Sequence, residues 1–367
     1  MADSDPNKAA ADTGLDALRR QIDETDRQLL ELVNRRAGLA RQVGEVKQHS
    51  DAPVYRPERE AQIMRLLRDA NPGPLPGDAI EAIWREIVSG CRELERRLRV
   101  AFLGPVGTFS EQALLQRFGS GVEAIACPSL DEVFRATEAG TADFGVVPVE
   151  NSTEGAVSRT LDLLLQSPLE VSGEISIRIS QNLMSRSGAM QGVRRIVSHA
   201  QSLAQCAGWL QRNFPGLERV PVASNAEAAR LATLDDETAA IAGQNAAARW
   251  GVPIVAHNIQ DEANNRTRFA VIGRYRCAAS GADQTSLILS VPDRAGAVHA
   301  LIEPLARHGV SMKRFESRPA RQAGWEYYFY IDIIGHRDDE NIAVALAELR
   351  ERAAFFKVVG SYPRAVG

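Results

Sequence analysis

Apolar residues recur every three or four positions through residues 14–99. From Leu15 the pattern continues to Lys47 and predicts one long amphipathic helix. Residues 57–69, which begin with a proline suited to a first helical position, and residues 78–97 continue the pattern as two shorter helices. A segment rich in proline and glycine, residues 71–77, separates these two helices. Residues 14–99 are therefore expected to form an all-helical module.

Three basic residues, Arg19, Arg36 and Lys47, interrupt the apolar stripe of the long helix. A charge on a buried face is costly unless it is paired or reaches the edge of the stripe. Arg36 and Lys47 share one face, but Arg19 lies about 25 Å from Arg36 along the axis. If all three bind one small anion, Arg19 must come from a second chain. The helix, about 50 Å long, also overhangs its neighbours, which favours an intertwined dimer.

Apolar runs alternate with helical patterns through residues 100–276, which predicts an α/β fold. The order of elements restarts after Ile175, and this restart suggests two lobes around a cleft. The strand predicted for residues 144–149 ends in a polar cluster, where Ser152 or Thr153 could cap a helix over residues 156–165. A strand predicted for residues 175–183 leads onward from this first half.

Four polar clusters lie at strand–helix junctions or at the start of the last strand of this α/β region: residues 104–110, 150–155, 198–205 and 264–268. Strand ends and helix starts converge where ligands bind in α/β sheets, so the clusters are expected to line one cleft. His199 is a candidate general acid, and a purely structural histidine is the alternative.

Residues 285–362 follow a strand–helix–strand–strand–helix–strand order, which predicts a ferredoxin-like α+β domain. A short linker over residues 277–284 precedes it. The domain contains no catalytic cluster. It is therefore expected to regulate or to dimerise rather than to catalyse.

Composition narrows the class of protein. The chain has 367 residues, 44% apolar and 25% charged, with a net charge of −4, which is ordinary for a soluble protein and does not favour nucleic acid or an anionic membrane as partner. Residues 1–13 read as a disordered tail rather than a signal peptide. The four cysteines lack metal-type spacing. Free thiols, a cytoplasmic location and no metal are expected.

The helical module resembles the all-α chorismate mutases. The matching residues are Leu18-Arg19, Arg35-Arg36, Lys47 and Arg59-Glu60. The resemblance implies that Arg36, Arg59 and the partner chain's Arg19 hold the two carboxylates of chorismate. It also implies that Lys47 donates to the ether oxygen and that Glu60 binds the ring hydroxyl.

Two substrate-site positions of the module depart from this family's pattern. Cys91 stands where several relatives have serine, and Glu95 where others have glutamine. Glutamine always donates to the ether oxygen, but a glutamate donates only when protonated. With Glu95 as a catalytic group, we hypothesise that mutase activity falls as pH rises.

Residues 100–276 resemble prephenate dehydratases. Four motifs carry the likeness in order: Gly104-Pro105 with Gly107-Thr108-Phe109-Ser110, Val147 to Ser152, Ser198-His199 with Gln205, and Thr267-Arg268-Phe269. The resemblance implies loss of CO₂ and water from prephenate without a metal or cofactor, in a two-lobed fold like that of periplasmic binding proteins. Thr267 would assist departure of the ring hydroxyl. Arg268, beside Phe269, would fix a carboxylate, and the alternative is that it points to solvent. The residues implied to shape the cleft are Glu150, Asn151, Ser152, Ser198 and Gln205.

The C-terminal domain resembles ACT regulatory domains. The residues that match the family's phenylalanine-binding motifs are Gly296, Ala297, Val298, Glu316, Ser317 and Arg318. The whole chain thus resembles bifunctional chorismate mutase–prephenate dehydratases, which implies feedback by phenylalanine and a homodimer through the long helix and the ACT domain. A dehydratase preferring arogenate, a catalytically silent two-lobed binding protein, and an ACT domain that only dimerises are the alternatives.

Overall fold

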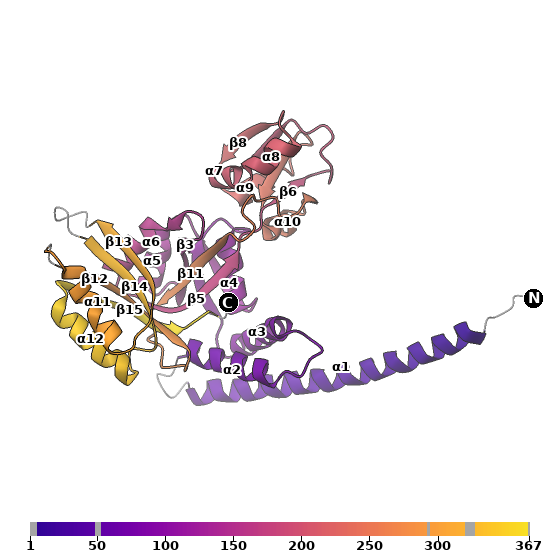
Figure 1. The fold of residues 1–367 in the computed structure, drawn as a ribbon. Helices are drawn as coiled ribbons and strands as arrows, with labels where there is room; N and C mark the ends of the chain where they lie inside the picture. The colour runs from indigo at the N-terminus through magenta and orange to yellow at the C-terminus, as the bar shows by residue number, and fades with distance from the viewer. Residues whose placement is uncertain (1–5, 48–52, 292–293, 320–326, 366–367) are drawn as a thin grey trace, which may run out of the picture.

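The computed structural model describes residues 6–47, 53–291, 294–319 and 327–365. Three parts follow one another along the chain: a helical module, a two-lobed central domain and a C-terminal domain (Figure 1). The expected multidomain fold class is confirmed.

The helical module consists of α1 (Pro6–Lys47), α2 (Pro57–Ala70) and α3 (Gly77–Glu93). In Figure 1, α1 projects far past α2 and α3, away from the rest of the molecule. It begins nine residues before the expected start at Leu15, inside the stretch expected to be a disordered tail, because Pro6 suits a first helical position and residues 9–11 are alanines. Residues 1–5 of that stretch lie outside the described residues.

α3 ends at Glu93, four residues earlier than the apolar pattern indicated. Leu94 and Glu95 form a turn, and the next strand begins at Leu98. Glu95 therefore follows the helix instead of lying in it, but it still packs against α1. A Cβ at Gly44 would lie 2.8 Å from Cγ of Glu95, so only glycine permits this close approach.

The first lobe of the central domain is built on a six-stranded sheet in the order β2-β1-β3-β11-β5, with β4 paired to β3. Its strands are β1 (Leu98–Leu103), β2 (Val122–Cys127), β3 (Phe144–Asn151), β4 (Gly155–Ala156), β5 (Glu170–Arg178) and β11 (Arg266–Gly273). Its helices are α4 (Phe109–Phe118), α5 (Leu130–Glu138) and α6 (Ser158–Gln166). β11 runs antiparallel to both β3 and β5, and so returns to the sheet at the end of the domain.

The helix expected over residues 156–165 is present as α6, but the cap expected at Ser152 or Thr153 is wrong. β3 continues to Asn151 and turns into β4 through Gly155, whose φ of 81° suits glycine. Val157, not Ser152 or Thr153, precedes the first turn of α6. The polar residues therefore shape a hairpin turn rather than cap a helix.

The second lobe carries a five-stranded sheet in the order β10-β6-β9-β7-β8. Its strands are β6 (Asn182–Ser185), β7 (Arg195–His199), β8 (Glu218–Val222), β9 (Thr238–Ala242) and β10 (Ile254–Ala256). Its helices are α7 (Ala200–Gln205), α8 (Ala207–Asn213), α9 (Asn225–Leu231) and α10 (Gln244–Trp250). The single strand expected over residues 175–183 is wrong, because the chain crosses between lobes there: β5 ends at Arg178 and β6 begins at Asn182.

The C-terminal domain has the expected ferredoxin-like element order. Its elements are β12 (Asp283–Ser290), α11 (Ala297–Arg307), β13 (Met312–Pro319), β14 (Tyr327–Ile334), α12 (Glu340–Arg352) and β15 (Phe355–Pro363). The antiparallel sheet runs β13-β14-β12-β15, and its apolar face packs with Leu301, Leu346 and Leu349 of the two helices.

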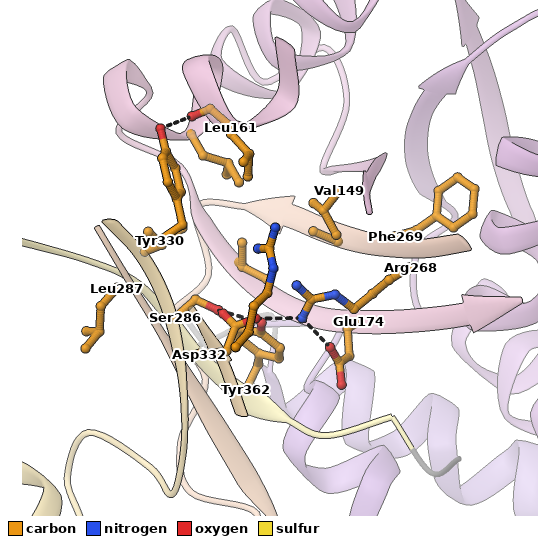
Figure 2. Close-up of a pocket in the computed structure, with 15 residues that line it drawn as sticks. Val149, Leu161, Glu174, Arg268, Phe269, Ser286, Leu287, Tyr330, Asp332 and Tyr362 are labelled. Atoms are coloured by element: carbon orange, nitrogen blue, oxygen red, sulfur yellow. Dashed lines mark hydrogen bonds and ion pairs between the residues drawn. The ribbon is translucent and has the colours of Figure 1, made fainter. Parts of the chain in front are cut away.

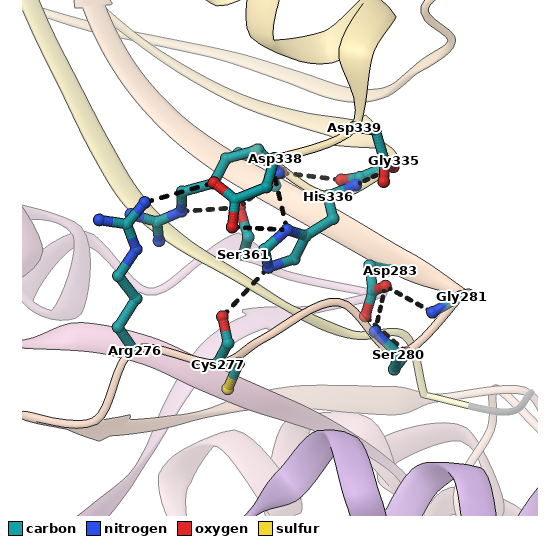
Figure 3. A network of polar contacts seen from close by, with 12 residues as sticks. Arg276, Cys277, Ser280, Gly281, Asp283, Gly335, His336, Asp338, Asp339 and Ser361 are labelled. Atoms are coloured by element: carbon teal, nitrogen blue, oxygen red, sulfur yellow. Dashed lines mark hydrogen bonds and ion pairs between the residues drawn. The ribbon is translucent and has the colours of Figure 1, made fainter.

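Polar contacts hold the linker between the central and C-terminal domains in one conformation (Figure 3). His336 is fully buried; its Nδ1 accepts from the Asp338 N–H at 3.2 Å, so Nε2 donates to the Cys277 carbonyl at 3.1 Å. The Asp283 carboxylate accepts from the Ser280 and Gly281 N–H groups at 2.7 and 2.9 Å. The linker therefore fixes how the two domains are placed.

Candidate active sites

A cleft of about 370 Å³ lies between the two lobes of the central domain. Polar side chains from both lobes line it without any Asp, Glu, Lys or Arg among the described lining residues. They are Thr108, Ser110, Asn151, Gln181, His199, Gln201, Ser202, Gln205, Ser224, Asn225 and Thr267. The start of α4, at Thr108 and Phe109, also faces the cleft. The free N–H groups of such a helix start suit a carboxylate.

The hydroxyl of Thr267 is oriented by Asn151. The Asn151 side-chain oxygen accepts from the backbone N–H groups of Thr153 and Glu154 at 3.0 and 3.2 Å. Because those two groups can only donate, the amide nitrogen must face the other way, and it donates to the Thr267 Oγ1 at 2.8 Å. The Thr267 hydroxyl thus accepts from Asn151 and keeps its own proton for a group in the cleft.

The second lobe brings Gln205 and His199 to the cleft but keeps Ser198 behind it. Gln205 donates to the Glu154 carboxylate at 3.3 Å and so links the two lobes. Ser198 is fully buried; its hydroxyl lies 2.6 Å from the Ile241 carbonyl oxygen and 3.0 Å from the Asn225 side-chain oxygen, both of which can only accept from it. His199 is exposed and lines the cleft, which argues against a structural histidine.

Arg268 lies on the opposite face of β11 from Thr267 and Phe269, because successive side chains of a strand alternate. It faces the C-terminal domain, and its guanidinium pairs with Asp332 of that domain at 2.8 Å and with Glu174 of β5 at 3.3 Å (Figure 2). It also pairs with Glu150 of β3 at 3.3 Å. Neither Arg268 nor Glu150 lines the cleft. Ser152 is also outside it and accepts from the Arg266 N–H at 2.9 Å.

The Arg268 cluster joins the two domains across a small cavity. The cavity there has about 30 Å³, room for about one water molecule. Burial would lower the pKa of Arg268, but neighbouring negative charges, led by Asp332, raise it. The Ser286 hydroxyl donates to the Asp332 carboxylate at 2.5 Å, so the C-terminal sheet holds Asp332 in place.

We expect Arg268→Gln to destabilise the protein by about 3 kcal/mol, since it leaves buried carboxylates without their cation. Thermal or urea unfolding followed by circular dichroism measures the effect. Arg276→Gln is the matched control, because Arg276 and its partner Asp338 are 59% and 62% exposed, and such pairs contribute less than about 1 kcal/mol. Equal losses in the two variants would contradict a buried ionic contact.

In the helical module, Lys47 and Glu95 come together while the predicted arginines do not. The Lys47 ammonium lies 3.2 Å from the Glu95 carboxylate and also donates to the Pro53 carbonyl at 3.1 Å. Arg59 is exposed, and Arg19 is 66% exposed at a distant point of α1. Arg36 is half-buried on α1.

Two other predicted substrate-binding residues of the module are Glu60, which is hydrogen-bonded within the module, and Cys91, which is buried. Glu60 accepts from Arg92 at 2.5 Å. Cys91 is only 5% exposed. All four cysteines are free and buried, and burial raises the pKa of Cys277 and Cys206 to about 12. The expected free thiols are confirmed.

The two predicted phenylalanine motifs lie at the same end of the C-terminal sheet. Ser290 and Arg318 both pair with Tyr328, and Gly296, Ala297 and Val298 begin the helix that follows Ser290. Glu316 is half-buried on β13 and Ser317 is exposed beside it. Arg318 reaches the central domain, where it pairs with Asp162 of α6 at 3.2 Å.

Sequence reasoning missed three polar cleft residues: Gln181, Ser224 and Asn225. Gln181 is 1% exposed at the crossing between lobes and donates to Ser202 at 2.9 Å. The three consecutive polar residues 180–182 inside the predicted strand were the available signal for Gln181. Asn225 follows Ser224, which caps α9, and a cap motif at a strand–helix junction was the signal there.

Neither a metal cluster nor a membrane span is present among the described residues. No group of three or more of their His, Cys, Asp or Glu side chains could hold a metal ion. None of their helices is long and apolar enough to cross a membrane.

Comparison with known proteins identifies each of the three parts. Residues 18–96 match the family model for chorismate mutase type II, residues 100–276 that for prephenate dehydratase, and residues 285–351 that for the ACT domain. The fold and site therefore define an enzyme that joins an isomerase module and a lyase module to a regulatory domain.

Full-length relatives identify the family. A bifunctional chorismate mutase/prephenate dehydratase of Neisseria gonorrhoeae is 50% identical over 95% of this chain and 96% of its own. One of Pseudomonas aeruginosa is 43% identical over the full length of both. The crystal structure of an Arthrobacter aurescens prephenate dehydratase with L-Phe is 35% identical, with a TM-score of 0.67, over 72% of this chain and 90% of that one. The chain belongs to the bifunctional chorismate mutase/prephenate dehydratase family.

Proposed function

We propose that the chain rearranges chorismate to prephenate between α1, α2 and α3, and converts prephenate to phenylpyruvate in the cleft between the lobes. Phenylalanine inhibits the second reaction from the ACT domain. The observation that carries the dehydratase assignment is the Asn151–Thr267 hydrogen bond, since it directs the Thr267 hydroxyl into the cleft.

The dehydratase reaction consumes one proton. Prephenate, a dianion, loses CO₂ and its ring hydroxyl, and the hydroxyl leaves as water, so that phenylpyruvate carries one negative charge. Electrons of the departing carboxylate complete the aromatic ring. Thr267 donates a hydrogen bond to the leaving oxygen. The exposed imidazole of His199 is the one titratable side chain among the described lining residues that could supply the proton.

The mutase reaction is unimolecular, so the site has to hold a compact conformer and stabilise charge on the breaking C–O bond. Lys47 supplies the positive charge, with Glu95 beside it. Arg36, Arg59 and Glu60 bind the carboxylates and hydroxyl, and Cys91 packs behind them. Arg19 completes the site from a second copy of the chain.

The exposed face of α1 supports a homodimer. Nine large apolar side chains between Leu15 and Val46 are about half or more exposed on this helix. A single chain leaves that apolar stripe in water, and a second α1 would bury it. Light scattering should therefore give about twice the chain mass of 40.0 kDa.

We expect Glu95→Gln to flatten the alkaline side of the mutase pH profile. A glutamate donates only when it is protonated, so native activity should fall as pH rises. Glutamine donates at every pH, so the variant should exceed the native enzyme at high pH. Initial rates of chorismate loss across the pH range measure this, and identical profiles would contradict it.

Feedback inhibition is supported by the ACT domain and by the L-Phe bound to the Arthrobacter relative. The ligand would contact the motif at Gly296, Ala297 and Val298 and the motif at Glu316, Ser317 and Arg318. Arg318 also contacts α6 of the dehydratase domain. Phenylalanine binding can thus alter a contact made with the catalytic domain, and coupling between two sites requires such a contact.

One assay tests the three assignments together. Purified protein receives chorismate, and phenylpyruvate is followed by its absorbance in base, with and without phenylalanine. Phenylpyruvate that falls on adding phenylalanine supports all three. Accumulating prephenate would contradict the dehydratase assignment, and turnover of arogenate but not prephenate would favour the alternative substrate.

A further inference from the structure

A second large cavity, of about 580 Å³, lies where all three parts of the chain meet. Helices α2 and α3 form one wall, the end of α4 and the middle of β5 form another, and Lys313 and residues 363–365 contribute from the C-terminal domain. Of the predicted mutase residues only Glu60 borders it, and none of the predicted dehydratase or phenylalanine residues does. It therefore shares only Glu60 with the sites proposed above.

The cavity has an excess of positive charge. Seven basic and four acidic side chains line it. Three of the acids are already paired: Glu60 with Arg92 at 2.5 Å, Glu81 with Arg68, and Glu174 with Arg268 at 3.3 Å. The fourth acid, Asp69, is exposed at the rim.

Several guanidinium nitrogens of the cavity lack partners. Nε and Nη2 of Arg117 are shielded from solvent and have no hydrogen-bond partner, and Nε of the 7% exposed Arg92 is in the same state. The Arg85 side chain makes no hydrogen bond or ion pair within the described residues. Burial and the positive charge of Arg117 lower the pKa of Arg85. The neighbouring positive charges of Arg85 and Arg117 are costly to bury together without a counter-ion, so the arrangement favours an anion.

Apolar side chains line the cavity beside these basic residues. Met64, Val88, Phe118 and Ile175 give the cavity an apolar side. Guanidinium groups bind carboxylates through two parallel hydrogen bonds. We propose that this junction is a binding site for an organic carboxylate with an apolar body, held by Arg85 and Arg117. Because its walls belong to all three parts, the ligand would stabilise their packing on one another.

Benzoate is the probe, titrated calorimetrically into the full-length protein, with chloride at the same ionic strength in the reference. We expect saturable binding of one benzoate per chain in this cavity. Arg117→Gln and Arg85→Gln should each weaken this binding about tenfold or more. Arg186→Gln is the matched control, since Arg186 is 54% exposed on the second lobe.

Two variants keep the test informative if one of them folds poorly. Arg85 is only half-buried on α3, so its replacement should preserve the fold, which circular dichroism checks. Absence of saturable benzoate binding would overturn the proposal. So would benzoate binding of unchanged stoichiometry and affinity in a folded Arg85→Gln or Arg117→Gln variant.

Discussion

Replacing Thr267 with alanine is expected to lower phenylpyruvate formation from prephenate by about 10²–10⁴-fold, the usual contribution of a positioned proton donor. Asn151 fixes the direction of this hydroxyl, and no other described side chain presents a donor in the same place on β11. Chorismate consumption should stay unchanged, because the mutase residues lie in another module. Both rates can be measured on one protein sample with the two substrates.

Thr267→Ser is the matched control for this result. Serine keeps a hydroxyl that can accept from Asn151 and donate into the cleft, so most of the activity should return. Loss of both reactions in the alanine variant would indicate misfolding rather than missing chemistry. An alanine variant with native dehydratase turnover would remove Thr267 from the mechanism and leave His199 as the donor to test.

Replacing Lys47 with glutamine is expected to reduce chorismate turnover by about 10²–10³-fold, the loss typical when a donor to developing charge is removed. The Lys47 ammonium is 22% exposed and lies between Glu95 and the Pro53 carbonyl. Glutamine fits the space but carries no charge. Dehydratase turnover of added prephenate should remain native.

Arg41→Gln is the matched control for Lys47→Gln. Arg41 lies on the same helix, is 68% exposed and has only a distant partner in Glu45, at 3.9 Å. Its replacement removes the same charge from α1 without touching the proposed site. If both variants lose mutase activity equally, general electrostatics or dimer assembly, and not Lys47 itself, carries the effect.

Periodicity was sufficient to predict the three-part fold, because helices, buried strands and the ferredoxin-like order each leave a distinct apolar pattern. The cleft was predictable for a similar reason: its polar residues follow apolar runs. The boundaries of individual helices and strands were harder to predict. Residues 175–183 were predicted as one strand, yet they belong to two lobes, and the polar residues Ser180, Gln181 and Asn182 interrupt the pattern where the chain crosses.

The site residues differ in how far their roles could be predicted without the tertiary structure. Thr267 and Asn151 could be proposed from the sequence, and the hydrogen bond between them came only from the pairing of β3 with β11. The contacts of Arg268 could not be predicted from the sequence. Alternation along a strand shows that Arg268 and Thr267 lie on opposite faces, but it does not show which face the C-terminal domain covers. Gln181 was missed because its burial depends on the crossing.

The contact between Asp332 and Arg268 matters for anyone who wishes to shorten this chain. A fragment that ends before the ACT domain would lack Asp332, so Arg268 would keep only Glu150 and Glu174 at the newly uncovered face of β11. The residue next to it is Thr267. Such a fragment would be a different catalyst rather than a deregulated one, and its rate constants could not serve as the uninhibited reference for the intact enzyme.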